Sequence, residues 1–401
     1  METRKRSVSQ ILITGFKSNI NQYAMFIALI AVWLIFQILS GGEFITPRNL
    51  SNLLGQNVYI AILAVGMVLI MVAGHIDLSV GWLGGTAGAL AALAWTSWHW
   101  NIWAAIALAL SLGIVTGLWQ GFWVAYRGLP AFIVTLGSFL MFHGFILLSV
   151  KNGQTVPVQH GAIYQFGSGF LPQIFMKGVV GKDVPFHDLS MLLGIAAIVL
   201  YWVYELRNRA NRVKFGFEVL PWFLQLGKII LVSALIAGIF AIQTFYVGIS
   251  YAFLFLILLT LLFVFITTKT VFGRHVYAIG GNKEAAKLSG INIRARTMWV
   301  FVIMGTLAAV AGLVFTGRMA SASPAAGNLW ELDTIAAVVV GGTSTLGGEG
   351  TIIGAIIGAL FMGSLNNGML LLGLDIQYQY IIKGLILTLA VWFDIASKKR
   401  R

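Results

Sequence analysis

Long apolar runs separated by short polar stretches constrain the fold of this chain more than any other feature of its sequence. Most of these runs approach the length of about 20 residues that a helix needs to cross a membrane. The sequence therefore predicts an all-α, polytopic integral membrane protein. The predicted spanning or membrane-embedded segments are 24–40, 58–74, 80–98, 102–126, 130–150, 189–205, 229–247, 250–268, 297–317, 333–346, 351–373 and 379–396.

Two of these segments are weaker candidates for complete crossings. Segment 80–98 is interrupted by Gly84 and Gly85, and segment 333–346 is short and broken by glycine. Either segment can form a half-helix or a re-entrant piece, so we expect about 10–12 transmembrane helices.

The composition supports a membrane protein and argues against several other classes. Of the 401 residues, 59% are hydrophobic and 10% are charged, whereas soluble domains carry about 25% charged residues. The net charge of +13 fits an excess of basic residues in cytoplasmic loops, so we expect no nucleic-acid partner. The chain has no cysteine and six scattered histidines, so we expect neither a disulfide nor a metal site.

The distribution of basic residues predicts the orientation of the chain. With the N-terminus inside and alternating crossings, twenty basic residues fall in inside loops and five in outside loops. This bias predicts that both termini are cytoplasmic. We therefore expect a cytoplasmic N-terminal segment at 1–23, a transmembrane domain at 24–396 and a cytoplasmic basic tail at 397–401.

Two longer stretches are not apolar enough to be spans. Residues 151–188 are expected to form an outside loop with prolines and several glycines. In the inside segment 206–227, four basic residues precede several aromatic residues, an order that suits a helix lying at the level of the lipid headgroups. A plain loop remains the alternative for this segment.

The two halves of the chain share a weak repetition. His75-Ile-Asp77 precedes Gly84-Gly85-Thr86, and Glu331-Leu-Asp333 precedes Gly341-Gly342-Thr343. Internal duplication is common among transporters, so the pattern marks a candidate internal repeat.

Residues 276–293 have the features of a short water-soluble helix between two apolar runs. Gly280-Gly281 is suited to a tight turn, Asn282 to the N-cap and Glu284 to the first helical turn. Gly290 is suited to a left-handed stop. Such a short helix is unstable alone, so it either joins two spans or docks on a cytosolic partner.

This loop lies within a sequence signature that extends over nearly the whole chain. Phe272–Ile291 resembles the cytoplasmic signature of permeases in the ribose/xylose/arabinose/galactoside class of bacterial ABC importers. The length, the insertion at 151–228 and the ending Trp392-Phe393-Asp394 are most similar to the xylose-type branch. Further blocks that carry the resemblance are Leu63–Met67, His75–Gly81, Trp123–Arg127, Pro130–Leu136, Ala326–Asn328, Glu331–Asp333, Gly341–Thr343 and Gly347-Gly348.

The resemblance implies a function and a set of partners. Similar permeases seat a coupling helix of the cytoplasmic loop, here 269–296, in a cleft of a cytosolic ATP-binding subunit. An extracytoplasmic binding protein delivers a monosaccharide, here a pentose such as D-xylose, and a second permease copy completes the pore in the bacterial inner membrane, surrounded by lipid. The implied ATPase-coupling residues are Arg274, Gly280, Gly281, Asn282, Lys283, Glu284, Ala285, Ala286, Lys287 and Gly290.

A few polar residues interrupt the apolar segments and each requires an explanation. For Lys383, snorkelling to the outer interface is the favoured interpretation. Asp77 and Ser79 suit structural caps at a helix junction. The amides are candidates for the translocation path or for hydrogen bonds between helices; they are Gln120, Asn366 and Asn367.

The chain is not expected to be an enzyme. A nucleotide-binding P-loop has the pattern G-x-x-x-x-G-K-[ST], and the glycine-rich residues 341–350 lack its lysine. We therefore expect no cofactor on this chain, with ATP used by the partner. An ion-coupled secondary sugar transporter is the alternative; an intramembrane enzyme would need a catalytic cluster that the sequence does not offer.

Overall fold

The computed structural model describes residues 20–150, 153–175, 186–217 and 219–398, and nearly all of its regular structure is helical. Strands β1 (Val156–Pro157) and β2 (Ser321–Ala322) pair antiparallel. The helices are α2 (Ile20–Leu39), α3 (Pro47–Gln56), α4 (Val58–Val72), α5 (Val80–Thr96), α6 (Ile102–Gly121), the π-helical turn η1 (Phe122–Tyr126), α7 (Ala131–Ser149), α8 (Gly161–Ser168), α9 (Asp188–Lys214), α10 (Trp222–Thr244), α11 (Tyr251–Lys269), α12 (Val271–Gly281), α13 (Lys283–Leu288), α14 (Ile293–Arg318), α15 (Trp330–Val340), α16 (Ile352–Leu371) and α17 (Ile376–Lys398).

Each predicted apolar segment coincides with a helix, so the all-α membrane fold is confirmed. Among the described residues, eight helices are long and apolar enough to cross a membrane, and the bent pair α3–α4 gives a ninth. The two glycine-broken segments became α5, of 17 residues, and α15, of 11 residues. Both are shorter than a full crossing, as their glycines suggested.

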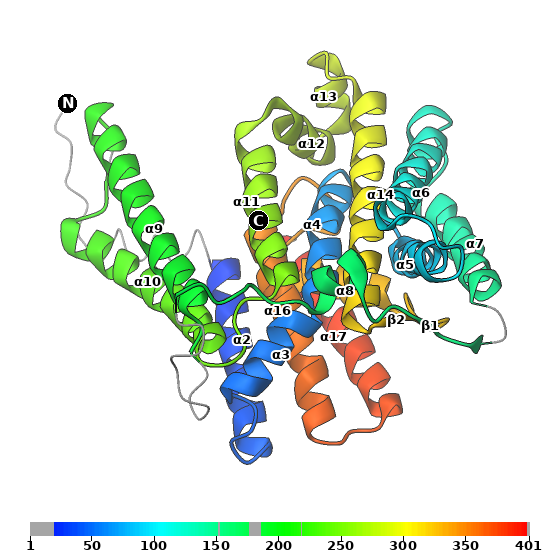
Figure 1. Ribbon diagram of the computed structural model, residues 1–401. Helices are drawn as coiled ribbons and strands as arrows, with labels where there is room; N and C mark the ends of the chain where they lie inside the picture. The colour runs from blue at the N-terminus through cyan, green and yellow to red at the C-terminus, as the bar shows by residue number, and fades with distance from the viewer. Residues whose placement is uncertain (1–19, 151–152, 176–185, 218, 399–401) are drawn as a thin grey trace.

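Helix α14 lies at the centre of the molecule and packs along α4, α5 and α6 (Figure 1). Most of its residues between Thr297 and Gly317 are buried. The close crossing with α5 depends on glycine: a β-carbon at Gly312 would overlap the carbonyl oxygen of Gly84. Small residues at such crossings let two backbones approach closely.

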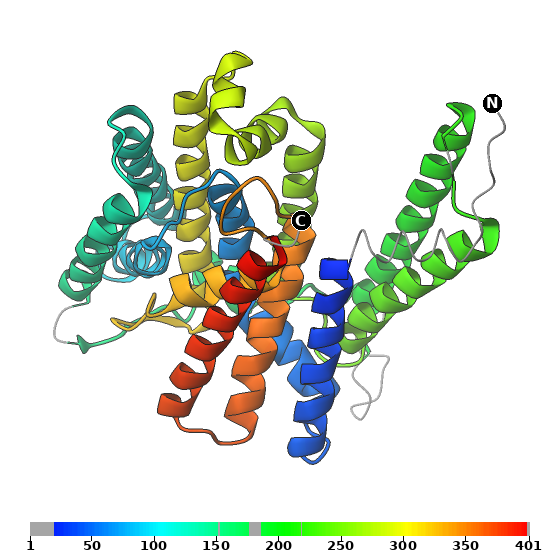
Figure 2. The same cartoon turned by 180° about the vertical axis from the view of Figure 1, so that it is seen from behind.

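Helices α2, α16 and α17 lie on one face of the molecule, as the reverse view shows (Figure 2). The side chain of Trp33 in α2 donates a 2.8 Å hydrogen bond to the Ser364 hydroxyl in α16. Helix α17 packs mainly on α15, and its other face presents apolar residues such as Leu385 and Leu389. This face is suited to lipid or to another apolar surface.

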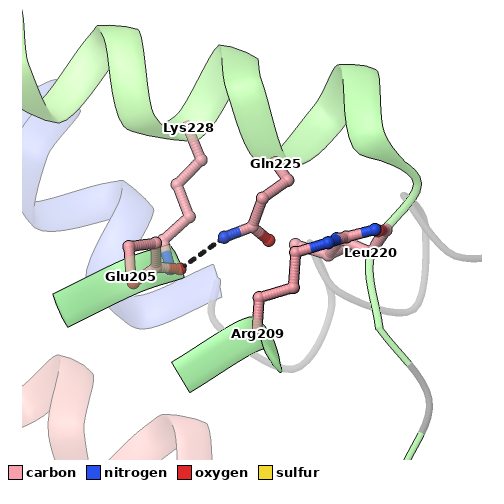
Figure 3. Close-up of polar contacts among 5 residues, drawn as sticks. All are labelled: Glu205, Arg209, Leu220, Gln225 and Lys228. Atoms are coloured by element: carbon pink, nitrogen blue, oxygen red, sulfur yellow. Dashed lines mark hydrogen bonds and ion pairs between the residues drawn. The ribbon is translucent and has the colours of Figure 1, made fainter. Parts of the chain in front are cut away.

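Helices α9 and α10 form a hairpin that leans away from the rest of the molecule (Figure 1). Within it, Lys228 Nζ lies 2.5 Å from Glu205 Oε1, and Gln225 donates to the same oxygen at 2.8 Å (Figure 3). Near the tip, Arg209 donates to the Leu220 carbonyl at 2.6 Å and stacks over Trp222. These contacts hold the two helices together within the hairpin.

The hairpin corrects the prediction for segment 206–227. Neither a separate interfacial helix nor a long loop forms: residues 206–214 continue α9 and residues 222–227 begin α10. Pairing between the two helices extends both of them past the ends of their apolar runs, because Glu205 and Lys228 satisfy each other there.

The base of the hairpin is closed by backbone hydrogen bonds. Leu171 N donates to Ile249 O at 2.9 Å, and Tyr251 N donates to Gly169 O at 3.0 Å. The end of α8 and the start of α11 therefore lie side by side, although more than 80 residues separate them. In the described part of the predicted outside loop 151–188, α8 packs against the end of α14, and β1 packs against α5 and β2.

Candidate functional site

The candidate coupling loop forms two helices, α12 and α13, at the end of the molecule drawn at the top of Figure 1. The predicted tight turn at Gly280-Gly281 is wrong, because both glycines are the last residues of α12. Gly280 is needed for a different reason: a β-carbon there would overlap the carbonyl oxygen of Val72 at the end of α4. The glycine lets α12 rest directly on the backbone of a central helix.

The ends of α13 form as the sequence predicted. The Asn282 side chain accepts a 2.9 Å hydrogen bond from Ala285 N, which satisfies a free donor of the first turn. Gly290 has a φ of +79°, the left-handed conformation that ends a helix. The Asn292 side chain then caps α14 in the same manner by accepting from Ala295 N at 3.0 Å.

The apolar residues of α13 differ in their exposure. Ala286, one of the implied coupling residues, is only 3% exposed and faces the chain itself, so it is not on the face that a partner would contact. Leu288, by contrast, is 88% exposed on a short helix that carries charges around it. The exposed residues of this loop also include Arg274, Gly281, Lys283, Glu284, Ala285 and Lys287. Leu288 is the most exposed large apolar side chain of this loop, ahead of Val271 at the start of α12, and sequence reasoning did not single it out.

Hydrogen bonds connect the glycine-rich segment 341–350 to α12 and to α4. Tyr277 Oη in α12 donates to the Gly350 carbonyl at 2.7 Å, and Gly348 N donates to Val72 O at 2.9 Å. At the other side of the segment, Thr345 N and Oγ1 donate to Asp394 Oδ2 in α17 at 3.0 and 2.9 Å. The segment therefore joins α12, α4 and α17.

A cavity of about 390 Å³ lies between α13 and the turn that follows α4. His75 lines it together with Lys283, Glu284, Lys287 and Arg294. Burial, and secondarily the charge of Lys283, lower the pKa of His75 from 6.5 to about 4. The imidazole is therefore neutral at physiological pH, where the positive charges of α13 can approach it without repulsion.

Acidification is expected to destabilise this end of the protein through His75. Its pKa is lower in the folded than in the unfolded chain, so the unfolded chain binds more protons between pH 4 and 6.5 and stability falls as pH decreases through that window. From pH 7.5 to pH 5 the loss is about 2 kcal/mol. Thermal unfolding of the detergent-solubilised protein at both pH values measures it. His75→Gln should flatten the difference; an equal pH dependence in this variant would contradict the assignment.

At the α4–α5 junction, the predicted caps Asp77 and Ser79 are hydrogen-bonded to each other, and Ser79 is hydrogen-bonded to Gln120, a candidate residue of the translocation path. Asp77 Oδ1 accepts from Ser79 N at 2.9 Å and from Ser79 Oγ at 2.7 Å. Gln120 Nε2 donates to Ser79 Oγ at 2.7 Å. All three side chains are buried, so Gln120 lies within a structural cluster and not on an open surface.

The two neighbouring amides of α16 differ in their contacts. Asn367 exchanges two hydrogen bonds with Asn49 of α3, at 2.8 and 2.9 Å, which is a bond between helices. Asn366 instead donates to Asp333 Oδ2 in α15 at 3.4 Å. Of the three amides that the sequence singled out, Asn366 is therefore the one that donates directly to an ionisable side chain.

Lys383 forms an ion pair within the helices, and the expected snorkelling is wrong. Its Nζ lies 2.9 Å from Asp333 Oδ2, and the two side chains are 20% and 9% exposed. Asp333 lies in the first turn of the short α15. The sequence reasoning missed the pair because 50 residues separate its members.

The comparisons with known proteins cover nearly the whole chain. The family of the branched-chain amino acid transport system / permease component matches residues 49–391. The chain is 40% identical over 388 residues to the xylose transport system permease protein XylH of Escherichia coli (strain K12), covering 96% of this chain and 95% of the relative. The Haemophilus influenzae XylH is 40% identical over 382 residues, covering 95% and 98%. The ribose import permease protein RbsC of Escherichia coli (strain K12) is 34% identical over 369 residues, covering 92% of each chain. No solved structure matches.

Proposed function

This chain belongs to the branched-chain amino acid transport system / permease component family, and on that premise we propose that it is the translocation subunit of an ATP-driven importer of a monosaccharide. D-xylose is the proposed sugar, because the relatives with 40% identity are named xylose permeases and cover the chain almost end to end. The single observation that carries the proposal is this identity over 96% of the chain.

The geometry of the α12–α13 loop supports a coupling role. The loop presents Leu288 to a cytosolic partner while charged neighbours such as Lys283 and Lys287 remain exposed around it. A single well-placed apolar anchor surrounded by charges is suited to docking in a cleft of an ATP-binding subunit. We propose that Arg274 and the exposed residues 281–285 and 287–290 form this contact.

A continuous set of contacts could carry a movement of the loop into the membrane helices. Displacement of α12 would act on segment 341–350 through Tyr277, and that segment is bonded to α4 at Gly348 and to α17 at Asp394. The same segment follows α15 and precedes α16. Closure of the ATP-binding subunits would thus move α15 and α17, and alternating access would follow from their motion.

The proposed orientation in the membrane is that of an importer. The apolar helices make the chain a multi-pass protein of the inner membrane. We propose that both termini and α12–α13 face the cytoplasm, since basic residues concentrate in those parts of the sequence. The extracytoplasmic binding protein would deliver the sugar from the other side, to a pore completed by a second permease copy in the lipid bilayer.

Transport in inside-out and right-side-out vesicles tests the proposal. We expect uptake of labelled D-xylose to require the binding protein and ATP hydrolysis by the co-purified ATP-binding subunit. Uptake should persist when a protonophore collapses the ion gradient. Uptake that needs neither the ATP-binding subunit nor ATP, and that stops with the protonophore, would instead favour the ion-coupled secondary transporter.

A further inference from the structure

The ion pair between Lys383 and Asp333 borders a cavity to which the preceding sections assign no role. The cavity has a volume of about 340 Å³ and lies between α15, α16 and α17. Its lining combines the ion pair with Asn328, Tyr380 and apolar side chains, among them Leu387. Small-molecule sites have volumes of about 300–1,000 Å³ and combine an apolar wall with a few polar groups.

A largely buried ion pair among apolar helices requires a reason. Charged groups within spanning helices are costly, and those that occur commonly lie on substrate pathways. Lys383 and Asp333 join two helices that have few other polar contacts with each other, yet a pair of apolar residues would serve packing at least as well. The charges are therefore better explained by a polar ligand than by stability.

We propose that this cavity, defined by Asn328, Asp333, Tyr380, Lys383 and Leu387, binds a monosaccharide on its way through the permease. The Lys383 ammonium has three N–H donors, and its bond to Asp333 occupies one of them. A carboxylate accepts up to about four hydrogen bonds. An ammonium and a carboxylate side by side thus meet the needs of adjacent sugar hydroxyls, each of which both donates and accepts.

The charge and the neighbours of the site indicate a neutral ligand. Lys383 and Asp333 together carry no net charge, so the site offers no excess attraction for an anion or a cation. Asn328, which lines the cavity beside the ion pair, adds an uncharged amide with both donors and an acceptor. The Tyr380 ring at 43% exposure offers an apolar face for the C–H groups of a sugar ring.

The position of the cavity links it to the energy-coupling loop. Helix α15 is directly followed by segment 341–350, and α17 is bonded to that segment at Asp394. A movement of α12 would therefore change the spacing of the two helices that carry Asp333 and Lys383. The inference rests on the proposed sugar transport, and it assigns the residues at which the permease itself holds the sugar.

The absence of cysteine allows a direct test on the full chain in complex with its ATP-binding subunit. Leu387→Cys lies in the cavity, whereas its matched control Leu385→Cys is 58% exposed on the outer face of the same helix and does not line it. A cationic methanethiosulfonate should label Leu387→Cys about tenfold faster than Leu385→Cys, because water reaches the cavity and not the lipid face. Millimolar D-xylose, but not sucrose, should slow the labelling of Leu387→Cys. Equal labelling of both variants, or labelling that the sugar leaves unchanged, overturns the proposal.

Uptake measurements distinguish a role of the Lys383–Asp333 pair in sugar binding from a purely structural role in joining α15 to α17. The double variant Lys383→Met/Asp333→Leu leaves no unpaired charge, so a purely structural pair could be replaced without harm. We expect D-xylose uptake to fall about 30-fold while co-purification with the ATP-binding subunit persists. Uptake within about twofold of the wild type would make the pair structural only and overturn the site. A wild type that transports no sugar, with Leu387→Cys still protected by sugar, would overturn the proposed transport and keep the site.

Discussion

Gly312→Ala is expected to prevent the native packing of the membrane helices. A β-carbon at this position would overlap the Gly84 carbonyl oxygen, and this obstacle is backbone that no change of rotamer can move. Helices α5 and α14 would have to separate, which costs about 3 kcal/mol or more. Because α14 also packs on α4 and α6, the separation would disturb the whole centre. Thermal unfolding in detergent and the amount of protein in the membrane fraction measure the effect.

Gly238→Ala provides the matched control for this substitution. Gly238 also lies within a long apolar helix, α10, but a β-carbon there would meet no atom within 4 Å. Alanine favours a helix over glycine by about 1 kcal/mol, so the control should be as stable as the wild type or slightly more stable. Equal losses for the two variants would show that the close approach of α5 and α14 does not govern packing.

Leu288→Asp is expected to abolish both co-purification of the ATP-binding subunit and ATP-driven sugar uptake. Leu288 is 88% exposed, so the change leaves the fold of α13 intact while it removes the apolar group that a partner would bury. Burial of a leucine contributes about 2 kcal/mol, and placing a carboxylate in an apolar cleft adds a larger penalty. Affinity should therefore fall by at least about 100-fold. Pull-down from detergent and vesicle uptake measure the two effects.

Two further substitutions show whether Leu288 acts by contact. Leu288→Met keeps an apolar side chain of similar volume and should retain binding within about threefold. Val213→Asp introduces the same charge at an exposed residue in the last turn of α9, away from the loop, and should leave binding unchanged. Loss of binding in Val213→Asp as well would attribute the effect to charge in general and not to the coupling loop.

The apolar pattern predicted most of the fold because a membrane requires long, internally hydrogen-bonded helices. The ends of α13 were predictable for a local reason: the bond from Ala285 N to Asn282 and the positive φ of Gly290 depend only on neighbouring residues. Sequence reasoning failed where the partner lies far along the chain. Gly280 serves Val72 and not a turn, and Lys383 pairs with Asp333 instead of reaching the interface.

The sequence signature located the candidate coupling loop, but it did not show which residues of α13 are buried and which are exposed. Six residues are too few for a periodic pattern, so the sequence could not tell that Ala286 faces inward and Leu288 outward. The same limit applies to the amides. Asn366 and Asn367 are adjacent, yet one bonds to a carboxylate and the other to an amide, because consecutive residues on a helix point in different directions.

The closed base of the α9–α10 hairpin has a consequence for the evolution of the chain's topology. Since residues 169–171 and 249–251 are already bonded to each other, a shorter chain could pass directly from α8 to α11 without moving either. The hairpin contains two apolar helices, each long enough for a crossing, so its gain or loss changes the number of crossings by an even number. The sidedness of everything after it, α12 and α13 included, is therefore preserved, and such a hairpin is a unit that evolution can insert or delete whole.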